Sequence, residues 1–215
     1  MVSAIAYAIM LMGFRFMASA QYLKYEAKDV ILTIGGFIYG PIGAVAASFV
    51  VALAEMLTIS ETGPIGFLMN FLAAISFAGI ASLVYSKIRT ARGAAIGLAL
   101  GSLSLSAVML LWNYIITPIY MSVPRSVVAG MLLPVFLPFN LIKAGLNSAF
   151  ILLIYKPLIT ALRAARLLPD RIQPGASHNA EARSGAGLKI NIILDVCAAI
   201  LFIACAIAIF FVSAK

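Results

Sequence analysis

Apolar segments long enough to cross a bilayer recur along almost the whole 215-residue chain, and they restrict its fold to one class. A transmembrane helix needs about 20 mostly apolar residues. Here 64% of the residues are hydrophobic and only 10% are charged. A mean hydropathy of +1.11 is typical of a membrane protein and not of a soluble domain. We therefore predict an all-α polytopic membrane protein in a lipid bilayer.

The chain divides into a core, a linker and one further helix. Within residues 1–168 we predict six helical segments, at residues 1–20, 28–39, 41–57, 65–85, 94–117 and 127–162. Pro41 suits the first turn of the third segment, and Pro118 is expected to end the fifth. Residues 169–188 are rich in Gly, Ser, Ala and charge, which predicts a flexible cytoplasmic linker. Residues 189–213 predict one additional transmembrane helix.

Positive charge is concentrated at particular loops of this +8 chain. Lys87, Arg89 and Arg92 lie between the fourth and fifth segments, and further basic residues follow the sixth. The positive-inside rule makes these loops cytoplasmic. The N-terminus is then cytoplasmic, and the polar loop at residues 21–29 lies outside. The same distribution argues against a nucleic-acid partner.

Lys143 lies in the middle of the apolar stretch from Met131 to Tyr155. On a helix, Asn140 and Asn147 share its face, because spacings of three and four residues return to the same side. A lysine at membrane depth costs roughly 2.5–3.5 kcal/mol on insertion scales. We interpret it as part of a ligand, proton or ion site. The alternative is a lysine that reaches the interface from a helix end.

Four more residues could join Lys143 in a pocket that opens outward. They are Glu55, Asn70, Trp112 and Asn113, which lie in or beside apolar surroundings. Amides recognise the carbonyl and N–H edges of a flat heteroaromatic ligand, and aromatic rings stack on it. Asparagines also join membrane helices through hydrogen bonds, so a purely structural role is the alternative for each of them.

Catalytic and metal-binding signals are weak in this sequence. The single histidine, His178, lies in the predicted linker, and no HExxH, GxSxG or GxxxxGK[ST] pattern occurs. We therefore expect neither an enzyme nor a metal site. Active transport by such a chain would need ATP hydrolysis by another subunit.

Five short motifs occur in a characteristic order across residues 1–168. They are LKYEAKD at 23–29, GFIYGP at 36–41, GFLMNF at 66–71, WNY at 112–114 followed by TPIY at 117–120, and PFNLIK at 138–143. Together they resemble the riboflavin-specific substrate-binding (S) component of energy-coupling factor (ECF) vitamin transporters. Two features depart from that pattern: Ile31 stands where the family usually has proline, and residues 170–215 match nothing in it.

The resemblance implies a six-helix S-component core in the plasma membrane of a prokaryote. Such a protein binds riboflavin from outside as its transported ligand, with no cofactor. Its partners would be an ECF transmembrane coupling subunit and two ABC-type ATPases. Asn113, Asn140 and Lys143 would hydrogen-bond the isoalloxazine edge of the ligand, while the loop that carries Tyr25 and Asp29 would cover its ribityl chain.

The resemblance also implies a docking site on the first helix. There Ala4 and Ala8 would contact the coupling subunit, since small residues let two helices approach closely. Two other interpretations remain at this point. The chain could be an S component for another vitamin, or a retinal-type photoprotein that uses Lys143. The second needs an acidic counter-ion in the membrane, and no aspartate lies within the third to fifth segments.

Overall fold

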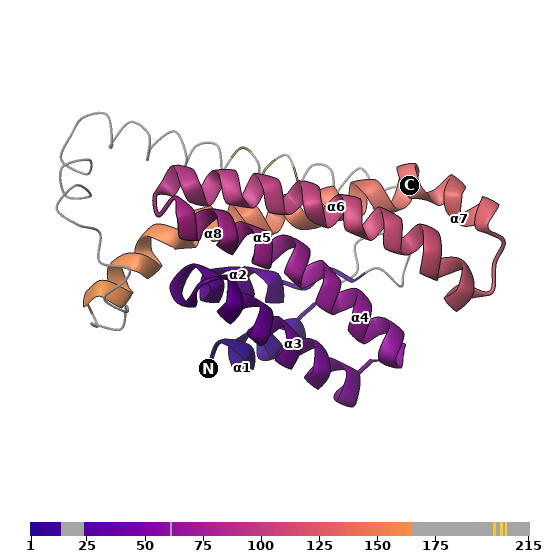
Figure 1. Ribbon diagram of the computed structural model, residues 1–215, viewed down its shortest axis with the longest axis horizontal. Coiled ribbons are helices and arrows are strands. Elements are labelled where there is room, and N and C mark those ends of the chain that lie inside the picture. Colours follow the sequence, from indigo (N-terminus) through magenta and orange to yellow (C-terminus); the bar gives the residue numbers. More distant parts are fainter. Residues whose placement is uncertain (14–23, 61, 165–199, 201–202, 204, 206–215) are drawn as a thin grey trace.

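A computed structural model describes most of the predicted core (Figure 1). The described residues are 1–13, 24–60, 62–164, 200, 203 and 205. The predicted linker at 169–188 lies outside them, as does the predicted helix at 189–213 apart from its three described positions.

The regular elements of the described part are all helical. They are α1 (Val2–Met10), α2 (Lys28–Tyr39), α3 (Pro41–Thr58), α4 (Gly63–Ala74), the π-turn η2 (Ile75–Gly79), α5 (Ile80–Lys87), α6 (Ala91–Met121), α7 (Arg125–Met131), the π-turn η3 (Leu132–Phe136) and α8 (Leu137–Ala164). Helices α4, η2 and α5 follow one another without a break, and so do α7, η3 and α8. The described chain therefore forms six helical rods.

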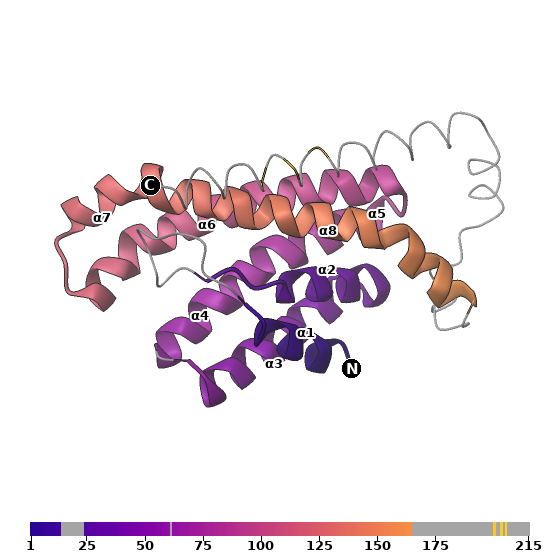
Figure 2. The ribbon, with the colours of Figure 1, turned by 180° about the vertical axis from the view of Figure 1, so that it is seen from behind.

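The rods pack in an elongated bundle. The two longest, α6 and α8, run antiparallel and side by side (Figures 1 and 2). Helix α2 packs against α8, and α1 and α3 pack against α2. Four helices are long and apolar enough to cross a membrane: Pro41–Thr58, Gly63–Lys87, Ala91–Met121 and Arg125–Tyr155. The chain is thus built as a multi-pass membrane protein.

The predicted helix bounds agree only in part with the structure: the first segment, predicted over residues 1–20, was too long, because α1 ends at Met10. The second and third helices begin at Lys28 and Pro41, as the sequence indicated. The prediction that Pro118 ends the fifth helix was wrong, because α6 continues to Met121. Proline removes only one backbone donor, so a helix anchored on both sides can run through it. The end is instead marked by Ser122, whose φ of 53° is left-handed.

Glycines let α6 lie close to the rod formed by η2 and α5. A Cβ atom on Gly97 would come within 2.7 Å of the Ala81 carbonyl oxygen. One on Gly101 would come equally close to the Phe77 carbonyl oxygen. Such close backbone contact is the main source of helix association in lipid, where no hydrophobic driving force acts between helices. This contact fixes the position of α6, which carries Asn113 into the site.

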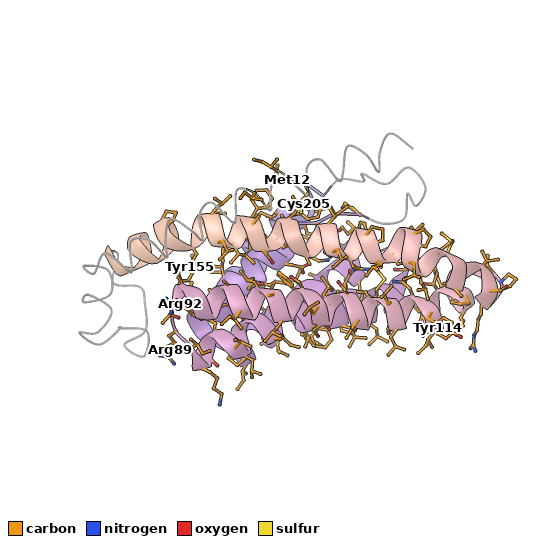
Figure 3. All side chains as sticks on the ribbon, turned by 90° about the horizontal axis from the view of Figure 1, so that it is seen from above. Met12, Arg89, Arg92, Tyr114, Tyr155 and Cys205 are labelled. Atoms are coloured by element: carbon orange, nitrogen blue, oxygen red, sulfur yellow. The ribbon has the colours of Figure 1, made fainter. Side chains whose placement is uncertain are left out.

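The two ends of the bundle differ in chemistry. Figure 3 shows Arg89 and Arg92 near Tyr155 at one end of the α6–α8 pair, and Tyr114 at the other. We refer to these as the basic end and the Tyr114 end. The neighbour of Tyr114 in sequence, Asn113, is buried. The predicted ligand-binding residues can therefore be sought at the Tyr114 end.

Candidate functional site

A cavity of about 230 Å³ lies between α3, α4, α6, α8 and the segment that precedes α2. Its charged and amide side chains are Lys24, Glu26, Glu55, Asn70, Asn113, Asn140 and Lys143. Five of these, all but Lys24 and Glu26, were selected from the sequence. The structure thus brings together side chains from four helices that are far apart in the chain. Met69, Met109 and Phe139 complete the wall with apolar surface.

Two amides are anchored on their own helices in the same way. Asn113 Nδ2 donates to the Met109 carbonyl at 2.7 Å, and Asn140 Nδ2 donates to the Phe136 carbonyl at 2.8 Å. Thr117 Oγ1 donates to Asn113 Oδ1 at 2.8 Å. An amide nitrogen carries two N–H groups, so each asparagine keeps one for another acceptor. Both side chains are therefore fixed in direction and still able to bind.

The helix around Asn140 is irregular for a local reason. Pro134 lies in η3 and Pro138 in the first turn of α8, and neither has an N–H to donate to the preceding turn. Loss of these hydrogen bonds favours a wider turn, and π-turns are frequent at functional sites. The turn ends at Phe136, whose carbonyl receives the Asn140 side chain. The irregularity thus coincides with the cavity wall.

Lys143 has a buried counter-ion that the sequence analysis did not supply. Its Nζ lies 3.1 Å from Asp29 Oδ2, and Asp29 is only 1% exposed. Asp29 had been assigned to a polar loop, but it belongs to the first turn of α2. It does not line the cavity and lies behind Lys143. The cost of a lysine at this depth is offset by an ion pair, which the flanking amides could not provide.

Tyr25 and Asn147 support Asp29 from behind. Tyr25 Oη donates to Asn147 Oδ1 at 2.9 Å, and Asn147 Nδ2 lies 3.5 Å from Asp29 Oδ2. Burial raises the pKa of the Tyr25 hydroxyl, and the Asp29 carboxylate raises it further. The hydroxyl therefore remains protonated and donates at any ordinary pH. Neither Tyr25 nor Asn147 lines the cavity, and Trp112, half-buried against the core, does not line it either.

A second ionic group joins Glu55 to three residues that were missed, because Lys24, Glu26 and Lys28 look like loop charges in the sequence. Lys28 Nζ lies 2.7 Å from Glu26 Oε2 and 2.6 Å from Glu55 Oε2. Glu55 Oε1 accepts a hydrogen bond from Asn70 at 2.7 Å. Lys24 Nζ lies 3.4 Å from Glu26 Oε1. The alternation of acid and base in residues 24–29 was the available signal, and it was interpreted as an exposed polar loop.

Among the described residues, the charges around the cavity balance. The cations are Lys24, Lys28 and Lys143, and the carboxylates are Glu26, Asp29 and Glu55. A site with paired charges, two anchored amides and apolar walls suits a neutral ligand that is partly flat and partly rich in hydroxyl groups. Within the described ranges, no cluster of His, Cys, Asp or Glu side chains is arranged to hold a metal ion.

A second cavity, of about 420 Å³, lies towards the basic end. Its wall includes Phe37, Tyr39, Tyr85 and Arg89, and among the described residues Arg89 is its one charged side chain. Tyr85 is engaged with Phe37, whose ring centroid lies 4.3 Å away, and with the Tyr155 hydroxyl at 2.7 Å. This cavity lacks the convergent polar groups of the first one, which is the stronger candidate for ligand binding.

This chain is similar to known proteins over most of its length. A family model described as ECF transporter, substrate-specific component, matches residues 1–155. The riboflavin transporter FmnP of Bacillus subtilis (strain 168) is 32% identical over 184 residues, which are 78% of this chain and 94% of that protein. The riboflavin transporter RibU of Staphylococcus aureus (strain TCH60) is 28% identical over 169 residues, covering 76% and 89%.

Solved structures match as well. Among them is the S component of a bacterial ECF transporter, which aligns with a TM-score of 0.62 at 29% identity over 75% of this chain and 92% of that chain. Every residue of the cavity falls inside the matched family region.

Proposed function

This chain belongs to the substrate-specific components of ECF transporters, and we propose that it binds riboflavin in the cavity at the Tyr114 end and selects it for uptake. The observation that carries the proposal is the convergence of Asn113, Asn140 and Lys143 on one buried cavity. Riboflavin is proposed as the ligand because the two relatives described above are riboflavin transporters. The retinal alternative finds no support in these relatives.

The two ends of riboflavin would be recognised by different parts of the wall. The edge of the isoalloxazine ring carries carbonyl oxygens and unprotonated ring nitrogens, which accept hydrogen bonds and so match the free N–H groups of Asn113 and Asn140 and the Lys143 ammonium. The ribityl chain carries hydroxyl groups, which suit the carboxylates of Glu26 and Glu55 as acceptors. Each of those carboxylate oxygens already receives one donor and can accept another.

The remaining residues selected from the sequence act at or behind this wall. Asn70 lines it and is held by Glu55. Tyr25, Asp29 and Asn147 support it, and Trp112 packs beside it. In this proposal the charge balance favours riboflavin over its phosphate ester, because a phosphate group would add two negative charges beside Glu26 and Glu55.

Transport requires partners, and α1 offers a contact surface for one. Ala4 and Ala8 are both exposed on α1, whereas Ala6 faces the core. We propose that Ala4 and Ala8 contact the ECF transmembrane coupling subunit, which two ABC-type ATPases would drive. The N-terminus would be cytoplasmic and the cavity would open to the outside, as the positive-inside rule indicates.

The test is ligand binding by the protein alone, purified in detergent without ATP. We expect saturable quenching of riboflavin fluorescence, a weaker response to riboflavin phosphate, and no competition by thiamine or biotin. An Asn113→Leu, Asn140→Leu double variant should lose the response while it keeps its melting profile. Tight binding of thiamine or biotin without flavin quenching would assign the chain to another vitamin and refute the proposal.

A further inference from the structure

Asp29 occupies an unusual position for an ionised group. It is 1% exposed, and one of its oxygens, Oδ2, receives both Lys143 Nζ at 3.1 Å and Asn147 Nδ2 at 3.5 Å. Its other oxygen, Oδ1, is buried and has no hydrogen-bond partner among the described residues. A buried carboxylate with one unpaired oxygen is costly, and the ion pair with Lys143 offsets part of that cost.

The groups around Asp29 form one connected chain. Tyr25, from the segment before α2, holds Asn147 of α8 at 2.9 Å. Asn147 holds Asp29 of α2, which in turn holds Lys143, one helical turn before Asn147. Lys143 is the only member of this chain that lines the cavity. The ammonium group is thus fixed through residues from three segments, and none of the other three residues lines the cavity.

We propose that Asp29 is a positioning residue for Lys143 and does not contact the ligand. It fixes the lysine ammonium at the cavity wall, and through Asn147 and Tyr25 it ties the position of that ammonium to the segment that precedes α2. The inference rests on the proposed function in one respect, because it takes Lys143 to contact the flavin ring. It departs from the sequence-based expectation that Tyr25 and Asp29 meet the ligand directly.

A double-mutant cycle separates positioning from contact. Loss of one hydrogen bond to a charged group corresponds to roughly ten- to a hundredfold in affinity, and we expect Asp29→Asn to weaken riboflavin binding to that extent. In a Lys143→Met background the same change should weaken binding no further than about twofold, which is less than the loss of one hydrogen bond to a charged group. Asp29→Glu, which keeps the charge, should restore part of the affinity. Independent, additive losses would overturn the proposal.

A second ligand locates the effect within the site. Lumiflavin has the flavin ring without the ribityl chain. If Asp29 acts through Lys143 on the ring, Asp29→Asn should weaken lumiflavin and riboflavin by the same factor. A loss confined to riboflavin would mean that Asp29 meets the ribityl chain, and the proposal would then be wrong.

Thermal melting of the ligand-free protein separates the inference from the proposed function. Asp29→Asn and Lys143→Met should each lower the melting temperature, because each leaves one charge buried without its partner. The double variant should melt higher than either single one, and Lys87→Met, at an exposed lysine, serves as the matched control. If the double variant melts higher than either single variant but no flavin binds, only the riboflavin assignment is refuted. If the double variant loses as much as the two single variants together, the ion pair is refuted as a positioning device, whatever the ligand.

Discussion

Lys28 offers the most direct test of how this site is held together. The side chain is 3% exposed and lies between two carboxylates, at 2.7 Å from Glu26 and 2.6 Å from Glu55. Glu26 precedes α2 and Glu55 belongs to α3, so this one ammonium joins two separate walls of the cavity. Lys28→Met keeps the apolar stem and removes the charge.

The magnitude follows from burial. Removing one partner of a buried ion pair costs about 3–5 kcal/mol, because the remaining charge stays out of water without compensation. Here two carboxylates would be left facing each other, with Lys24 as partial compensation for Glu26 at 3.4 Å. For a chain of this size each kcal/mol shifts the melting temperature by roughly 2–4 °C. We therefore expect a decrease of about 6–20 °C.

The assay is thermal melting in detergent, monitored by intrinsic fluorescence. A riboflavin titration of each variant measures its affinity. Lys28→Arg should stay close to wild type, and Lys28→Met with Glu26→Gln should recover part of the loss because one unpaired charge disappears. Riboflavin affinity should fall with Lys28→Met, since Glu26 and Glu55 would separate. This reasoning would be refuted if Lys28→Met had the same melting temperature as the Lys87→Met control and bound riboflavin with normal affinity.

Three further predictions concern other parts of the chain. Ala8→Trp should leave riboflavin binding by the isolated protein unchanged but abolish co-purification with the coupling subunit and uptake in cells; wild-type uptake would place docking elsewhere. Truncation after Leu168 should leave affinity within a few-fold, because the described cavity wall ends before that residue; loss of binding by a folded truncated protein would contradict this. Gly101→Ala should lower the melting temperature, because its Cβ meets the Phe77 carbonyl oxygen at 2.7 Å, whereas Gly130→Ala, with open space around it, should not.

Sequence reasoning located the amides, Glu55 and Lys143 of the cavity wall, but it failed on the ion-pair partners of Glu55 and Lys143. Asn140 and Lys143 were placed on one face because their separation of three residues is a local property of a helix. The counter-ion of Lys143 was missed because Asp29 lies 114 positions earlier, and only tertiary packing brings the two together. Lys28 was missed for a related reason: a charge beside an apolar segment looks exposed until the rest of the bundle covers it.

The resemblance gave the family, and the relatives and the family model confirm it. The residues and partners carried over from that family remain proposals, and the predicted linker and last helix stay predictions. Of that last helix the described positions include Cys205, which is buried beside Tyr25, Ile142 and Leu146. The contact is with the segment before α2 and with α8, which no pattern in the sequence indicated.

The turn η3 has a consequence for how relatives of this chain should be compared. A π-turn is commonly the trace of one inserted residue, and each residue of an α-helix advances the face by about 100°. Val128, before the turn, is buried, and so are Asn140 and Lys143 after it. In a sequence that lacked the inserted residue, either Val128 or the pair Asn140 and Lys143 would face inward, but not both. Gaps placed within residues 132–136 of an alignment therefore mark a change in which side chains face the cavity, even where every motif residue is retained.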